Sequence, residues 1–440
     1  MKMDKASFIY QIFSTFLTRI ILLLGGFIAS VLTARILGPE GKGILTAVFV
    51  IPTLVVTLAD LGIRQASAYY IGKKEHSTED VASTLYLLWL VTSCLSLLIV
   101  GLIYWLQFGD KYGWAIFIIV MLTIPLNLAV QYTKGIMQGK TRIGSINTSE
   151  LIKVGLNIAF MVLLVLVFRM NVIGAALTQL LLALFAWAYS MRVVRKDTAV
   201  RLKYVPGLPM LLIRKGIAYA VALFVLQLNY RIAVVFLEHY TTASEVGIFS
   251  VGTNLAELIW QVPAAVGMVI FARSANSKTD AEAVQRSVAF LKYLMPLLLA
   301  GGVVFWLVCP WMVSLLYGAE FASSALIIRY LLPGILMMVI FKVLNADMAG
   351  RGFPLYALWV ATAPLVLNVV LNFLLIPQYG GSGAAAASSI SYTLSGILYL
   401  IVYCRKENVQ LKVFFSYQLS DMKAITGRLS RKRQTAAAGK

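Results

Sequence analysis

Ionisable side chains inside long apolar segments are the residues of this 440-residue sequence that could do chemistry. A charge at the centre of a bilayer costs about 2.5–3.5 kcal/mol, so such a residue is expected to face water or a bound substrate. Arginine and lysine are also well suited to bind phosphate groups. Four of the deep charges are positive and two are negative, which favours a cavity for an anionic substrate. The six residues are Arg19, Asp60, Arg64, Lys153, Arg231 and Glu257.

The first polar group lies at helical spacing in the segment from 43 to 71. Thr57, Asp60, Arg64 and Ser67 are three or four residues apart, so they are expected to share one helix face. Asp60 and Arg64 would then form an i,i+4 pair of opposite charge. Two interpretations stay open: the pair is an internal salt bridge that helps the helix insert, or it belongs to a cavity wall with a titratable carboxylate.

A second polar group occurs in the other half of the chain. Asn254, Glu257 and Gln261 have the same helical spacing, and Gln227 precedes Arg231 by four residues. These residues fall in the predicted seventh and eighth helices, as Arg19 falls in the predicted first helix and the first polar group in the second. We therefore expect equivalent helices of each half to line a central cavity.

Two further acids can pair with bases on their own helices, and the pair of Asp347 with Arg351 is expected to be structural. Glu150 precedes Lys153 by three residues, and Asp347 precedes Arg351 by four. Each acid can therefore pair with a base on its own helix.

The composition excludes a soluble globular protein. Apolar residues make up 60% of the chain and charged residues only 13%, about half the charged fraction of an ordinary soluble domain. Since a helix needs about 20 apolar residues to cross a bilayer, we predict an all-α integral membrane protein with twelve transmembrane helices and short loops. Neither HExxH nor GxSxG occurs, so no enzyme is expected. Three scattered cysteines and two histidines predict no metal site and no cofactor.

The basic residues predict the orientation. With twelve spans, 27 of the 38 Lys and Arg residues fall on the side of the two termini, and only Lys42, Lys111 and Arg169 fall in connections on the other side. Because Lys and Arg collect in cytoplasmic loops, both termini are expected in the cytoplasm. The net charge of +20 would then face anionic lipid rather than nucleic acid.

The two halves of the chain resemble each other. Ala34-Arg-Ile-Leu-Gly-Pro-Glu-Gly-Lys-Gly-Ile44 precedes the second segment as Tyr240-Thr-Thr-Ala-Ser-Glu-Val-Gly-Ile248 precedes the eighth. The repeat predicts two six-helix lobes related by a pseudo-two-fold axis along the membrane normal. The predicted domains are an N-lobe at 1–200, a linker at 201–211, a C-lobe at 212–404 and a basic cytoplasmic tail at 405–440. Within the tail, residues 413–433 are either a surface-lying helix or partly disordered.

The first 75 residues also resemble a known family. Thr33-Ala-Arg-Ile-Leu-Gly-Pro-Glu-Gly-Lys-Gly-Ile44, Leu58-Ala-Asp-Leu-Gly-Ile63 and Tyr70-Ile-Gly-Lys73 are similar to the N-terminal signature of the polysaccharide transporter family, the Wzx-type O-antigen and exopolysaccharide flippases of the MATE-like flippase superfamily. The resemblance implies a MATE-like fold in the bacterial inner (cytoplasmic) membrane. It also implies export of undecaprenyl-diphosphate-linked oligosaccharide for O-antigen of lipopolysaccharide, for capsule or for exopolysaccharide. Membrane lipids, a polysaccharide polymerase and a chain-length regulator are the implied partners.

Three kinds of function stay open. The first is such a flippase, working by alternating access, with lipid II as a second candidate substrate. The second is a MATE-type drug/cation antiporter, which would need an acidic cavity, whereas the deep charges here are mostly positive. The third is a membrane scaffold without transport, which leaves the buried charges unexplained. By analogy with the superfamily, Asp60 or Glu257 would couple transport to proton flow.

Overall fold

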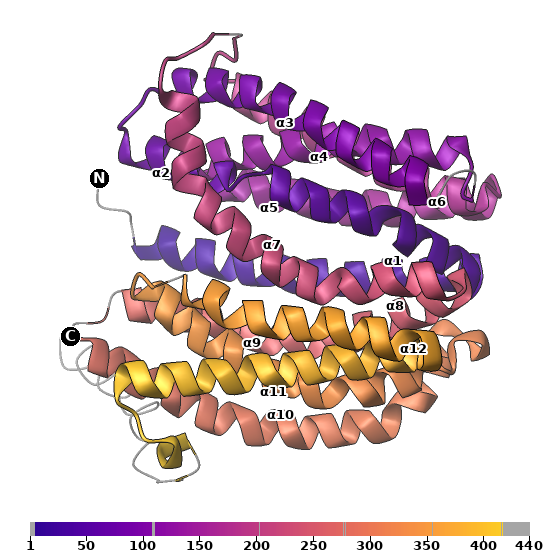
Figure 1. Cartoon of the computed structure of the whole chain (residues 1–440). Helices are drawn as coiled ribbons and strands as arrows, with labels where there is room; N and C mark the ends of the chain where they lie inside the picture. The colour runs from indigo at the N-terminus through magenta and orange to yellow at the C-terminus, as the bar shows by residue number, and fades with distance from the viewer. Residues whose placement is uncertain are drawn as a thin grey trace. The chain divides into compact units, whose positions relative to one another are not determined.

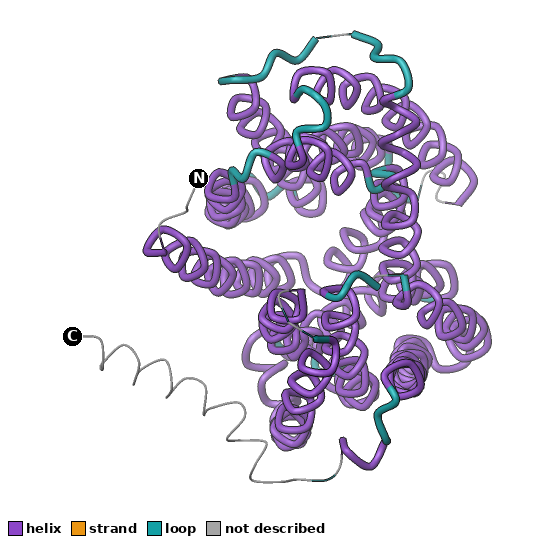
Figure 2. The backbone as a smooth tube through the Cα atoms, turned by 90° about the vertical axis from the view of Figure 1, so that its left-hand side faces the viewer, coloured by secondary structure: helices purple, strands orange, loops and turns teal. Residues whose placement is uncertain are grey.

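The computed structural model describes residues 5–107, 111–201, 203–275, 277, 279–353, 355–414 and 416; the side chains of residues 5–17, Arg19 and Gln107 lie outside this description. All regular secondary structure in the described part is helical, as Figure 2 shows, which confirms the predicted all-α class. Most of the segment at 413–433, predicted as a surface-lying helix or partly disordered part of the tail, lies outside the described residues.

The chain packs into two units. The first comprises Met1–Val251 and Ser314–Phe321, and the second comprises Gly252–Val313 and Ala322–Lys440. The last four residues of the predicted linker at 201–211 form the first turn of α7, which belongs to the first unit. The predicted lobe boundary stays a prediction, because it is drawn from the internal repeat, whereas the two units are defined by packing. Helices of the first unit are α1 (Lys5–Ala59), α2 (Ile63–Lys73), α3 (Thr78–Gln107), α4 (Trp114–Gly139), α5 (Ile143–Phe160), the π-helical η1 (Met161–Val167), α6 (Asn171–Arg195) and α7 (Leu208–Tyr240).

The remaining helices begin at the junction of the units. The helix α8 crosses it, and α10 returns to the first unit at its last turn. These helices are α8 (Ala243–Glu257), η2 (Leu258–Trp260), α9 (Gln261–Ala275), α10 (Asp280–Tyr317), η3 (Ala319–Phe321), α11 (Ser324–Gly350), α12 (Tyr356–Glu407) and η4 (Leu411–Phe414).

Ten helical stretches of the described chain are long and apolar enough to cross a membrane. Two of them, Ile20–Lys73 with 54 residues and Tyr356–Glu407 with 52, are more than twice as long as one crossing requires. The helices α1 and α12, which make up most of these stretches, each contain a glycine with non-helical backbone angles, Gly38 (φ 66°) and Gly380 (φ 53°). Figure 1 shows α1 and α12 each reversing direction. If both stretches cross twice, the count is the predicted twelve, which stays a prediction.

The structure corrects the predicted segment from 43 to 71. The helix α1 ends at Ala59, and α2 begins at Ile63. Between them Leu61 (φ 48°) and Gly62 (φ 64°) adopt left-handed angles, which end a right-handed helix. The prediction that one helix face runs through Asp60 is therefore wrong, since the spacing rule holds only along an unbroken helix.

Small residues set the close helix contacts of the first unit. A methyl group on Gly43 of α1 would overlap the carbonyl oxygen of Ala243, and one on Gly247 of α8 would overlap that of Pro39. These two glycines lie in the segments that the internal repeat pairs with each other. Glycine permits such close backbone approach, as is common where membrane helices pack.

In the second unit α11 is the central helix and packs against α9 and α12. At its end the Asp347 carboxylate lies 2.7 Å from the Arg351 guanidinium, which confirms the predicted pairing. Asp347 also accepts hydrogen bonds from Ser274 (2.5 Å) and Tyr403 (2.7 Å), and Arg351 lies 2.9 Å from Glu407. The cluster joins α9, α11 and α12 and has a structural role.

Candidate functional site

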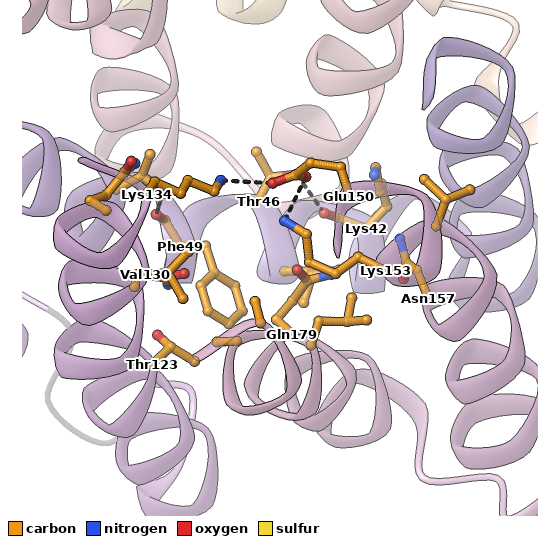
Figure 3. Close-up of a pocket in the computed structure, with 18 residues that line it drawn as sticks. Lys42, Thr46, Phe49, Thr123, Val130, Lys134, Glu150, Lys153, Asn157 and Gln179 are labelled. Atoms are coloured by element: carbon orange, nitrogen blue, oxygen red, sulfur yellow. Dashed lines mark hydrogen bonds and ion pairs between the residues drawn. The ribbon is translucent and has the colours of Figure 1, made fainter. Parts of the chain in front are cut away.

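The first unit contains a cavity of about 610 Å³ between α1, α4, α5 and α6. Its walls are rich in polar side chains, although the four helices lie in membrane-spanning stretches. Figure 3 draws the residues that line the cavity and labels ten of them. The polar lining residues are Lys42, Thr46, Thr53, Thr123, Asn127, Gln131, Lys134, Glu150, Lys153, Asn157 and Gln179.

Glu150 lies between two lysines in this cavity, as Figure 3 shows. Its Oε2 is 2.7 Å from Nζ of Lys153 on the same helix, and its Oε1 is 2.7 Å from Nζ of Lys134 on α4. The predicted Glu150–Lys153 pair is therefore confirmed, while the contact with Lys134 connects two helices. About a fifth to a quarter of each of these side chains is exposed, so the charges are accessible from the cavity.

Lys42 is the third cation of the cavity wall. Only 9% of it is exposed, and among the described residues its ammonium group makes no ion pair or hydrogen bond. Burying an ammonium group without a counter-ion is costly. The cavity wall thus carries three positive charges against one negative charge, and one of the positive charges lacks a counter-ion.

Neutral donors and acceptors surround these charges. On three of the helices, the charged and neutral lining residues are three, four or seven positions apart. Each of these helices therefore presents a polar stripe to the cavity. Amide and hydroxyl groups of this kind hydrogen-bond both to phosphate oxygens and to sugar hydroxyls. The stripes are Lys42, Thr46 and Thr53 on α1, Asn127, Gln131 and Lys134 on α4, and Glu150, Lys153 and Asn157 on α5.

Of the nine residues predicted for the site, Lys153 is the one that the structure places in the wall of this cavity. Arg64 borders it, because its Nη1 lies 3.5 Å from Oε1 of the lining residue Gln131. Asp60 is 8% exposed, and its Oδ1 has no hydrogen-bond partner among the described residues. The side chain of Arg19 lies outside the described residues.

The other predicted residues lie elsewhere. Gln227 and Arg231 are half-buried on α7 of the first unit. Asn254 and Glu257 end α8, and Gln261 begins α9, in the second unit. The 3-10 turn η2 lies between Glu257 and Gln261, and the shared helix face of these three residues stays a prediction. Whether these residues meet the substrate stays a prediction.

Sequence reasoning missed Lys42 and Lys134 as cavity residues. Each lies close to charged or glycine residues at which the chain is divided into predicted helices, so neither is counted among the deep charges. Lys42 was expected in an outward connection, but it lies inside α1 and is buried. The signal was present in the spacing: Thr46 follows Lys42 by four residues, and Asn127 and Gln131 precede Lys134 by seven and three. Such stripes cross an otherwise apolar helix.

Solved structures with this fold include two kinds of transporter. The chain is 17% identical to a structure described as the lipid II flippase MurJ in an inward closed conformation, over 92% of this chain and 89% of that one, with a TM-score of 0.72. It is also 17% identical to an inward-facing multidrug resistance MATE family transporter of the MOP superfamily, over 88% and 94% of the two chains, with a TM-score of 0.68. At this identity the likeness shows the fold, and it confirms the predicted MATE-like architecture.

A third similar structure is a MOP superfamily transporter from Pyrococcus furiosus, for which a reversed polarity of the binding pocket suggests a different function. It is 17% identical to this chain over 90% of this chain and 95% of that one, with a TM-score of 0.62. The comparison with curated proteins finds no match. The sequence profile of a family described as polysaccharide biosynthesis protein matches residues 6–278, more than half of the chain. The protein therefore belongs to the polysaccharide biosynthesis protein family and has the fold of MATE-like flippases and transporters.

Proposed function

We propose that the protein is a flippase that moves undecaprenyl-diphosphate-linked oligosaccharide across the bacterial inner membrane by alternating access. The observation that carries the proposal is the cationic cavity of the first unit, whose wall contains three lysines, Lys42, Lys134 and Lys153, and one carboxylate, that of Glu150. The glycan would serve O-antigen, capsule or exopolysaccharide synthesis, as membership of the family supports.

Charge supports an anionic substrate. A diphosphate carries about two negative charges and would meet the two lysines paired with Glu150. It would also meet Lys42, which has no counter-ion among the residues that the structure describes. In a cavity sheltered from bulk water these attractions are stronger than at an exposed surface. An organic cation would meet three lysines and one acid already held by two of them. This makes a drug/cation antiporter the weaker candidate.

The neutral polar residues support a sugar-bearing substrate. Asn127, Gln131, Asn157 and Gln179 present both amide donors and carbonyl acceptors to the cavity. The lipid tail of the substrate would stay in the bilayer, since only the diphosphate and sugars need a polar path. Lipid II has the same charge pattern and remains the second candidate substrate. A polysaccharide polymerase and a chain-length regulator are the partners that we propose.

A reconstituted flipping assay tests the proposal. The purified chain is placed in liposomes with a fluorescent undecaprenyl-diphosphate oligosaccharide, and exposure of the glycan at the outer leaflet is measured with a membrane-impermeant glycosidase. We expect the wild-type chain to accelerate exposure over protein-free liposomes. Lys42→Gln should slow it about tenfold, because a charge-assisted contact contributes about 1.5–3 kcal/mol, and Lys42→Arg should retain part of the activity.

Lys73→Gln is the matched control, because Lys73 is exposed at the end of α2 and lies outside the cavity. It should flip the lipid at the wild-type rate. If the wild-type chain fails to move the glycolipid but exchanges a lipophilic cation for protons, the flippase assignment is wrong and the antiporter takes its place.

A further inference from the structure

A second polar pocket, of about 510 Å³, lies at the end of the first unit where α5 begins and α6 ends. Three of its six lining residues are cationic, one is a tyrosine and none is acidic. Both helices belong to membrane-spanning stretches that end here, at Ile143 and Arg195. The pocket is therefore at the predicted cytoplasmic edge of the membrane. Its lining residues are Arg142, Ser145, Tyr189, Arg192, Val193 and Lys196.

This pocket is separate from the cationic cavity. On α5, Ser145 is rotated by about 140° from Glu150, and Lys153 lies about two turns further along the helix. On α6, Arg192 and Lys196 lie near the last turn, whereas the cavity residues of that helix end at Ala186. The two sites share helices but have no lining residue in common.

The charge of the pocket is only partly compensated nearby. Asp197 forms an ion pair with Arg142 and lies 3.0 Å from Nζ of Lys140. The hydrogen bond from Lys140, together with the positive charges of Lys140 and Arg142, lowers the pKa of the Asp197 carboxyl, so it stays ionised at neutral pH. Arg192 and Lys196 make no ion pair or hydrogen bond with any described residue. Two positive charges thus remain for a ligand.

The backbone adds a further anion-binding element. Arg142 is the N-cap residue of α5, an 18-residue helix, and no side chain caps its first amide groups. The first N–H groups of a helix lack intrahelical acceptors and attract anions. Arg142 is also fixed in place, because its Nη1 donates to the carbonyl oxygen of Val193, 2.8 Å away.

The surface beside the pocket is apolar and aromatic. Tyr189 stacks on Phe185, with ring centroids 6.0 Å apart, one turn further into the span. On α5, Ile152 lies seven residues after Ser145 on the same helix face, and its side chain is exposed. Tyrosine is typical of the membrane interface, with apolar side chains beyond it. The order from the helix end is therefore cationic, aromatic and apolar.

We propose that this pocket binds the phosphate headgroup of an anionic membrane lipid, whose acyl chains lie along the apolar faces of α5 and α6. The order of side chains matches that of a phospholipid, from phosphate through glycerol to hydrocarbon. Basic pockets between membrane helices on the cytoplasmic side are suited to such headgroups. A free phosphate would use the cations alone and gain nothing from the apolar face.

Lipid binding to the full-length protein tests this proposal. The purified protein in neutral detergent is titrated with phosphatidylglycerol, phosphatidylcholine or inorganic phosphate, and the unfolding midpoint and the lipid retained in native mass spectrometry are measured. We expect phosphatidylglycerol to raise the midpoint and to be retained, with little effect of the other two. Arg192→Gln/Lys196→Gln should weaken phosphatidylglycerol binding about tenfold or more, since each cation near an anionic headgroup contributes about fivefold.

Lys73→Gln/Lys74→Gln is the matched control. It removes two exposed cations from the end of α2, away from the pocket, and should bind phosphatidylglycerol as the wild type does. Equal loss in both double variants would show attraction by net charge alone and overturn the proposal. Equal stabilisation by inorganic phosphate and by phosphatidylglycerol would also overturn it, because the site would then hold a free anion and not a lipid.

Discussion

Lys134 and Glu150 come from different helices, and their Nζ and Oε1 atoms lie 2.7 Å apart inside the cavity of the first unit. Because Glu150 also contacts Lys153 at 2.7 Å, one carboxylate holds two cations that would otherwise repel each other. An anionic substrate that enters the cavity would compete with Glu150 for these lysines. The ion pairs thus stabilise the packing of α4 on α5, and their lysines are also available to bind the substrate.

Glu150→Ala should destabilise the protein. It leaves Lys134 and Lys153 without a counter-ion, and the expected cost is about 1–3 kcal/mol, less than the 3–5 kcal/mol of a fully buried pair because the side chains are partly exposed. The unfolding midpoint in detergent measures this cost. The double variant Lys134→Met/Glu150→Ala should recover part of the loss, since a cation is removed along with the acid. A double variant less stable than Glu150→Ala would contradict the pairing.

Arg64→Ala should reduce glycolipid flipping about tenfold, because the guanidinium next to Gln131 is proposed to meet the diphosphate. Arg64→Lys should retain intermediate activity, since it restores the charge without the two-pronged donor. The amount of protein in the membrane is measured in parallel. In Asp60→Asn/Arg64→Ala the carboxylate is neutral; if this double variant restores flipping, Arg64 serves only to balance Asp60 and does not contact the substrate.

The predicted orientation is checked with reporter fusions. Fusions after Lys73, Lys140 and Arg201 should report the cytoplasm, and fusions after Lys111 and Tyr379 the periplasm, because positive residues stay on the cytoplasmic side. Tyr379 precedes the break in α12 at Gly380, so its fusion also tests whether that stretch crosses twice. Two contrary results would refute the twelve-span topology.

The contact between Gly43 and Gly247 should be sensitive to side-chain size. Gly247→Leu places a side chain against the carbonyl of Pro39, and overpacking of this kind costs about 1–3 kcal/mol or more. The yield of folded protein and its unfolding midpoint should fall. Gly26→Leu on α1 is the control, because a Cβ at Gly26 has no neighbouring atom within 4 Å. Similar losses in the two variants would show that the effect is not due to this contact.

The sequence alone determined the class of the protein. Long apolar runs cannot remain in water and form helices in a bilayer, so composition was sufficient for an all-α membrane protein. The glycines at 38 and 380 lie in the breaks that the sequence predicts between apolar segments, and both adopt angles that glycine tolerates. Pairs within one helix, such as Glu150 with Lys153, followed from spacing because a helix fixes the distance between residues three or four apart.

Only the tertiary structure decided which polar stripes meet. Lys42 is far in sequence from Lys134 and Glu150, which lie on two further helices. These helices lie together because of packing contacts such as those between α1 and α5 and between α4 and α6. Spacing rules also fail where a helix ends, as between Ala59 and Ile63, since left-handed backbone angles there depend on the local packing. A single sequence states which residues are polar, but packing decides which of them share a cavity.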